Sequence, residues 1–205
     1  MHKYNKHILL SINAVALVLI ILFISPVFAA TTNTVVTVTV NSVVAISSSG
    51  SVNLSIIPLP AGSQSANSDL VSVSTTDPNG YSLFIADASS VTNSLLGSGS
   101  NTIPATTSTT STSPVRILSA GYWGFCASTT TLSNFTCPSS PFSSDSIHSD
   151  YDFAQVPLYT NPLQIKRTVT TATNDPTTVW YGVSLNTSTP SGSYATTVTY
   201  TATGN

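Results

Sequence analysis

The chain has 205 residues, of which only 6% are charged and 41% are hydrophobic, and its formal net charge is −2. Beyond residue 29 it carries seven aspartates, no glutamate and three basic residues, Arg116, Lys166 and Arg167. So few basic groups cannot make a positively charged surface for phosphates, which excludes nucleic acid as a partner. Helix-favouring Glu and Lys are absent or rare while Ser, Thr and Val abound, and this composition predicts an all-β protein with hydroxyl-bearing solvent faces.

Residues 1–29 have the features of a Sec-type export signal. Two lysines, Lys3 and Lys6, precede a nearly unbroken apolar run over residues 8–24, and small residues lie at the usual positions before Ala29. This pattern predicts cleavage after Ala29 and a secreted or cell-surface protein made of residues 30–205. The alternative is an uncleaved anchor, because the apolar run approaches the length of a bilayer span. In that case the membrane is contacted only through this N-terminal segment.

The first third of the exported chain alternates apolar and polar residues with period two. Residues 36–46, 52–56 and 70–74 follow this pattern, which is typical of half-buried strands. The sequence Asp-Pro-Asn-Gly at 77–80 is a strong turn signal, and alternation resumes over residues 81–85. Residues 69–86 are therefore expected to form a β-hairpin. Residues 34–46 would also suit a strand exchanged with a neighbouring molecule.

The rest of the chain is less regular until its end. Residues 87–114 show a poorer strand pattern, and residues 104–114, which are almost all Thr, Ser and Ala, read as an exposed loop or a hydroxyl-rich strand edge, with disorder as the alternative. Residues 127–152 read as a long loop, and short apolar segments lie between and after these regions. Residues 179–185 and 194–202 alternate on either side of a Thr-Pro-Ser-Gly turn and predict a terminal antiparallel hairpin. About eight strands with no long helical period favour a single domain at 30–205, built as an antiparallel two-sheet sandwich.

Two stretches carry a family resemblance. They are STTDPNGYSLFI at 74–85 and TPSGSYATTVTYTA at 189–202, and the segment around Trp123 and Gly124 accompanies them. Together they resemble small secreted bacterial surface proteins with one immunoglobulin-like β-sandwich, distantly similar to WxL-type cell-wall modules and to pilus or adhesin modules. The resemblance implies a location and an architecture but no catalytic residue. The Trp-x-Leu signature itself has no counterpart in this chain.

Cys126 and Cys137 are the only cysteines of the chain. An even count in an exported protein predicts a disulfide, which would make residues 127–136 a stapled surface protrusion near the loop at 126–152. The rival interpretation is a pair of free thiols or a redox or metal pair. It lacks the Cys-x-x-Cys spacing and the neighbouring histidines of such sites.

The densest charge lies between residues 145 and 152. Asp145, His148, Asp150 and Asp152 offer three carboxylates and an imidazole, which suits a Ca²⁺ site, although the spacing matches no EF-hand loop. The alternative is a polar loop in which aspartates stabilise local turns. No other cofactor is expected.

The sequence offers little material for catalysis. His148 is the only histidine beyond residue 29, and no motif places a nucleophile beside it. Among the aromatic residues, Tyr122 and Trp180 are candidates for contact with a ligand or partner. Trp180 has the parity opposite to the apolar face of its strand, so it is either covered by a second layer or exposed as an anchor.

These observations predict a non-catalytic secreted or cell-surface protein with a structural or adhesive role. Its expected partners are other surface proteins or cell-wall and host glycans, and exposed edge strands would also allow a homopolymer. The alternative is an extracellular carbohydrate- or cell-wall-binding module that uses exposed aromatic residues and the loop at 145–152.

Overall fold

The computed structural model describes residues 32, 34–88, 95–106, 114–115, 117–129 and 131–205. The predicted export signal and its cleavage site after Ala29 lie outside these residues. The chain divides after Val40, and residues 41–205 form one folded unit. The described residues are strands, turns and irregular segments, with no helix among them. None of the described residues therefore belongs to a helix that could cross a membrane.

The described strands of residues 41–205 make three antiparallel sheets, which confirms the all-β class. The first sheet has the order β1 (Val44–Ser47), β2 (Ser63–Thr75), β9 (Ala172–Leu185) and β6 (Tyr122–Cys126), and β7 (Phe142–Asp145) also pairs with β2. The second has the order β10 (Val198–Gly204), β3 (Tyr81–Asp87) and β8 (Leu163–Arg167). A small ribbon joins β4 (Leu96–Ser98) to β5 (Asn101–Ile103).

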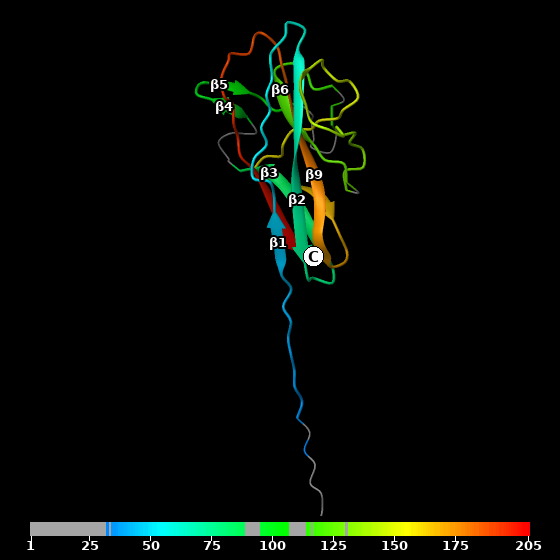
Figure 1. Cartoon of the computed structure of the whole chain (residues 1–205). Helices are drawn as coiled ribbons and strands as arrows, with labels where there is room; N and C mark the ends of the chain where they lie inside the picture. Colours follow the sequence, from blue (N-terminus) through cyan, green and yellow to red (C-terminus); the bar gives the residue numbers. More distant parts are fainter. Residues whose placement is uncertain (1–31, 33, 89–94, 107–113, 116, 130) are drawn as a thin grey trace, which may run out of the picture. The chain divides into compact units, whose positions relative to one another are not determined.

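The long strands β2 and β9 lie next to each other at the centre of the first sheet. They pair from Ser63 opposite Leu185 to Thr75 opposite Ala172 and run side by side in Figure 1. Their apolar side chains join those of β3 and β8 in a single core, in which Val71, Leu83 and Ile165 are fully buried. Two antiparallel sheets that share one core are consistent with a sandwich.

The predicted hairpin at 69–86 is wrong, although its turn is present. The Gly80 amide donates to the Asp77 carbonyl at 3.0 Å, and Gly80 has a φ of +83°, a conformation that favours glycine. However, β2 pairs with β9 and β1, whereas β3 pairs with β8 and β10 in the other sheet. The turn therefore carries the chain from one sheet to the other, and the apolar faces of both strands become buried in the shared core.

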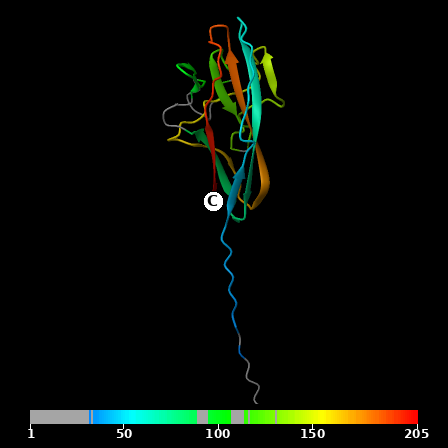
Figure 2. The same cartoon turned by 60° about the vertical axis from the view of Figure 1, so that its left-hand side comes forward.

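The predicted terminal hairpin is also wrong, for the same physical reason. Strand β9 lies in the first sheet and β10 in the second, beside β3. In the turned view of Figure 2, the red β10 and the blue β1 lie close together at the edges of their sheets. The two strands are also in contact. Across the two layers the hydroxyls of Tyr181 and Tyr200 are hydrogen-bonded at 2.7 Å. Alternation predicts that both strands exist but does not predict which strand each one pairs with.

The expected strand at 52–56 is extended but is not part of a backbone ladder. Its apolar residues Val52, Leu54 and Ile56 pack against the core, as their spacing predicts. Polar side chains at alternate positions of β2 donate to the carbonyls of this segment. They are Ser63 to Ile57 (2.6 Å), Ser65 to Ser55 (2.6 Å) and Asn67 to Asn53 (3.1 Å). Side-chain donors thus hold this segment against the face of β2.

The strand expected at 36–46 is shorter than the alternation of apolar and polar residues predicts. Only Val44–Ser47 pairs, with β2, and the described residues before it belong to no strand. Conversely, the region read as a long loop at 127–152 contains β7, and β4 and β5 lie before residue 104, where the sequence shows only a poor strand pattern. Short strands with mainly Ser, Gly or Asn carry too little apolar alternation to be seen in the sequence.

Candidate functional site

The predicted disulfide between Cys126 and Cys137 is confirmed, with an S–S distance of 1.98 Å. The loop that it closes is not a protrusion. Leu132 and Phe135 are buried, and the Phe135 ring lies 5.9 Å from that of Phe125 on β6. The Thr129 hydroxyl also donates to the Ile165 carbonyl of β8. The loop is therefore a packed cover over the strands, because its apolar side chains point inward.

Asp152 fastens the far end of this cover. Its carboxylate is buried and accepts a hydrogen bond of 2.8 Å from the Thr136 amide, while its own amide donates to the Thr136 carbonyl at 2.8 Å. Thr136 directly precedes Cys137, so Asp152 and the disulfide hold the same turn of chain. This position separates Asp152 from the other residues that the sequence grouped as a calcium site.

Trp180 lies under the same cover and is only 7% exposed. It lines a hollow with Phe135, Cys137 and Pro138, so a second layer covers it. The ring does not present an open face to a partner. Tyr122, the other predicted contact residue, is half-buried at the start of β6.

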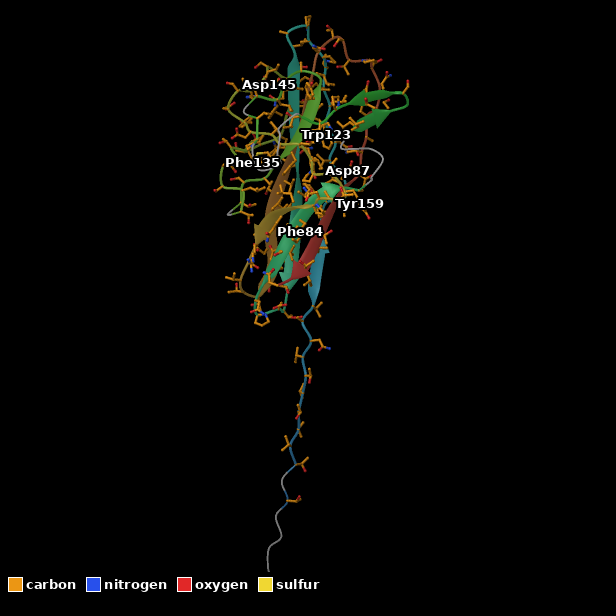
Figure 3. All side chains as sticks on the ribbon, turned by 180° about the vertical axis from the view of Figure 1, so that it is seen from behind. Phe84, Asp87, Trp123, Phe135, Asp145 and Tyr159 are labelled. Atoms are coloured by element: carbon orange, nitrogen blue, oxygen red, sulfur yellow. A yellow bond between two sulfur atoms is a disulfide. The ribbon has the colours of Figure 1, made fainter. Side chains whose placement is uncertain are left out.

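The remaining members of the predicted calcium site lie at the surface. Figure 3 shows Asp145 at the end of β7 on the flank that also carries Phe135. The His148 Nε2 atom is 3.3 Å from the Asp145 carboxylate, and its Nδ1 atom is 3.6 Å from the Asp150 carboxylate. These nitrogens lie on opposite edges of the imidazole, so the two carboxylates and the ring do not converge on one point. No group of three or more such side chains close enough to hold a metal occurs among the described residues.

Aromatic rings surround His148 on this flank. The Phe142 ring centroid is 4.6 Å from that of His148, and the Tyr151 centroid is 5.0 Å from it. All three residues are half-buried. The His148 amide also donates to the Gln64 side-chain carbonyl at 2.8 Å, which ties the loop to β2. These contacts explain the loop as a packed structural element.

A cavity of about 300 Å³ lies between the first sheet, strand β4 and the start of β10. We call it the Asp69 cavity. Its floor is made by Asp69, Trp123 and Tyr181 of the first sheet, and its walls come from residues 48–54, from β4 and from residues 196–200. Figure 3 labels Trp123 in the upper part of the view. The rings of Trp123 and Tyr181 are stacked at 6.4 Å between centroids.

Asp69 is the only charged group that lines the cavity, and it is 5% exposed. Its carboxylate accepts hydrogen bonds from the Ser49 amide, at 2.9 Å, and from the Ser49 hydroxyl. The Tyr200 hydroxyl lies near this carboxylate and is hydrogen-bonded to the Tyr181 hydroxyl. Burial raises the pKa of both tyrosines above their ordinary value, and the neighbouring Asp69 charge acts in the same direction. Both hydroxyls therefore stay protonated.

One hydroxyl at the cavity wall has no partner. The Oγ1 atom of Thr196 is buried and has no hydrogen-bond partner among the described residues. A buried hydroxyl without a partner costs free energy, roughly 1–3 kcal/mol. Because this oxygen has almost no accessible surface, it is buried in the wall and does not face the open space of the cavity.

A second feature is the valine arm, residues 34–40, which precede β1 in the chain. Its side chains are exposed, Val35 by 88%, Val36 by 82%, Val38 by 78% and Val40 by 82%. Even-numbered valines alternate with Thr37 and Thr39, the pattern of a strand with one apolar face. No strand is assigned to residues 34–40.

No protein-family model, no curated protein and no solved structure matches this chain. The two candidate sites are therefore interpreted from their geometry. Sequence reasoning found the arm as a strand available for exchange, but it missed the Asp69 cavity. The one available signal was an aspartate directly before the apolar Leu70–Val71 pair of a strand, which does not reveal burial.

Proposed function

We propose that this chain is a non-catalytic exported protein of the cell surface, and that it associates with other protein molecules through the valine arm. In this proposal the two sheets form an immunoglobulin-like sandwich that displays the arm and the sheet edges. The disulfide is weakly consistent with an extracellular location, because such bonds persist in oxidising compartments. The observation that carries the proposal is the run of exposed valines.

An exposed apolar strand is a template for pairing with another chain. Its backbone amides and carbonyls can join a sheet edge, and its alternate side chains can pack on the face beneath. Covering one valine contributes about 1.5 kcal/mol or more, so three valines on one face are enough to drive association. The scarcity of charge favours the same process, since few ions have to be desolvated when surfaces meet.

A second copy of the chain offers suitable edges. In the described sheets β8 and β10 each have a single ladder partner, β3, so their outer sides are edges. An arm that pairs with one of these edges on the next molecule leaves that molecule's own arm free. The contact is then head-to-tail and can propagate into a homopolymer.

Light scattering coupled to size-exclusion chromatography tests this proposal on the purified chain, after its N-terminus has been sequenced. We expect the average mass to rise with concentration, and the triple variant V36T/V38T/V40T to stay monomeric because Thr has the same shape without the apolar group. The matched control T37S/T39S changes the opposite face and should associate like the unmodified chain. Equal masses for the unmodified chain and the triple variant at every concentration would reject the arm as the contact.

Location is tested separately by antibody labelling of intact cells and of the medium. We expect labelling at the cell exterior. Labelling that appears only after the cells are permeabilised would reject the proposed surface role, whatever the association state.

A further inference from the structure

We propose that the Asp69 cavity receives the valine arm of a second copy of this chain. The inference rests on the proposed function, in which the arm joins molecules, and it names the place where the arm binds. The arm enters as an additional strand between residues 48–54 and the start of β10. It therefore uses the β10 edge rather than the β8 edge of the next molecule.

The cavity lies where two edges of the sandwich separate. One wall is formed by residues 48–54, which follow β1, and the opposite wall by residues 196–200 at the start of β10. Toward the other end of β10 the two edges are close, since a methyl group added to Gly204 would lie 3.7 Å from the Val44 side chain of β1. The space between the edges therefore opens at the cavity, where a further extended segment can enter.

Both walls offer backbone groups for pairing. The Ala88 amide donates to the Thr197 carbonyl at 2.9 Å, on the β3 side. Because the backbone groups of successive strand residues point to opposite sides, those of Val198 point away from β3. On the other wall the Ser55 carbonyl accepts a hydrogen bond from β2, so the backbone groups of Leu54 point away from β2 by the same alternation. An incoming strand can therefore form main-chain hydrogen bonds with either wall.

The floor and walls suit apolar side chains at every second position of that strand. The stacked rings of Trp123 and Tyr181 form the floor. Four apolar wall residues remain only partly buried, and they are Val52, Leu54, Leu96 and Val198. In an extended arm the exposed side chains of Val36, Val38 and Val40 lie on one face. Docking covers the apolar surfaces of both partners, which is the main favourable contribution to the association.

Charge favours this occupant and this edge. Residues 34–42 contain no charged side chain. Asp69, the only charged residue of the lining, is 5% exposed, and its carboxylate accepts hydrogen bonds from the Ser49 amide and hydroxyl. An uncharged arm therefore enters without displacing much water from an ion. β10 has no charged residue, whereas β8 carries Lys166 and Arg167, whose hydration an incoming apolar strand would disturb.

Blocking the cavity tests the docking site on the purified full chain. Ser51 is exposed and lines the cavity, so S51W places a large ring at its opening. Ser55 is exposed on the same segment outside the cavity lining, so S55W is the matched control. In light scattering we expect S51W to associate only at a concentration at least about tenfold higher than the unmodified chain needs, and S55W to associate like the unmodified chain. Circular dichroism checks that both variants keep the β spectrum.

Disulfide trapping locates the arm even if S51W does not fold. V36C, V38C and V40C are mixed one at a time with V198C, whose position lines the cavity at the β10 edge. The matched control is Q164C, which is also half-buried and lies on β8. We expect mass spectrometry of the linked peptides to find at least one arm variant joined to V198C and none joined to Q164C. Because each molecule carries one added cysteine, such a link joins two copies.

Two outcomes would overturn the inference and leave the proposed function in place. One is association of S51W at the same concentrations as S55W. The other is linkage of the arm to Q164C instead of V198C, which would assign the arm to the β8 edge. Monomers of the unmodified chain at every concentration, without any linkage, would instead reject the proposed function and this docking site with it.

Discussion

Removing the disulfide is predicted to destabilise the protein mainly through its unfolded state. The variant C126A/C137A opens a loop closed across 11 residues. For a loop of this length the chain-entropy relation gives a loss of about 3 kcal/mol in the free energy of unfolding. Loss of the buried Cys126 sulfur adds packing cost, on the order of 1 kcal/mol. The expected total is therefore about 3–4 kcal/mol.

The folded state should change little, because the loop has other attachments. Asp152 still binds the Thr136 amide, and Leu132 and Phe135 still point into the core. Trp180 lies under this loop and reports on it, so its fluorescence can be read in a W123F background, where it is the only tryptophan. We expect the native emission maximum to be the same with and without the disulfide.

Urea unfolding followed by circular dichroism measures the stability, and the slope m should rise because the uncrosslinked unfolded chain exposes more surface. D152N, which keeps the disulfide and weakens the other attachment, is the comparison variant. A loss below about 1 kcal/mol for C126A/C137A would refute the entropic reasoning. A red-shifted native Trp180 emission would show instead that the disulfide holds the folded cover in place.

Three further predictions concern a glycine of the first sheet and two ionisable side chains. G182A should cost about 1–3 kcal/mol in urea unfolding, because the added methyl would lie 2.4 Å from the buried Phe153 ring; stability within about 0.5 kcal/mol of the unmodified chain would contradict this packing. Burial opposes ionisation of Asp175, but hydrogen bonds from Lys166 and Tyr81 outweigh this effect and lower the pKa of Asp175. The contribution of ionised Asp175 to the free energy of unfolding is therefore present above the ordinary carboxyl pKa and is lost as the pH falls through the pKa of the folded state. K166M should make the free energy of unfolding depend less on pH in this acid range. Burial raises the pKa of Tyr200 above its ordinary value of about 10, so the stabilising contribution of Tyr200 is lost as the pH rises beyond 10. Y200F should therefore reduce the loss of unfolding free energy at alkaline pH, and it should remove one late-ionising group from the absorbance titration at 295 nm. An unchanged titration would argue against the burial of Tyr200.

The glycines of β6 and β9 show how local sequence and packing combine. Gly124 and Gly182 lie opposite each other in the ladder, where a side chain on Gly182 would overlap Phe153 and one on Gly124 would overlap the Ala154 carbonyl. Glycine inside a strand pattern predicts a close approach by other backbone or side chains. The sequence alone does not say that the approaching residue is Phe153.

Local chemistry in the sequence was sufficient for the class of fold, most of the strand positions, the Asp-Pro-Asn-Gly turn and the Cys126–Cys137 bond. Period-two alternation, turn residues and an even cysteine count each act over a few residues or a single pair, so they can be read without knowing the fold. The exposed valines of the arm belong to the same group. Their alternation was visible, and only the structure showed how far their side chains are exposed.

The tertiary structure alone decided which strands pair and which polar groups become buried. A turn joins two strands in the same way whether they lie in one sheet or in two, so neither the change of sheet after Asp77 nor that between β9 and β10 can be inferred locally. Likewise, Asp69 and Asp152 are ordinary aspartates in the sequence, and both are buried by residues far away along the chain. Burial is a property of the whole packed chain, because each face is covered by segments whose positions depend on all the others.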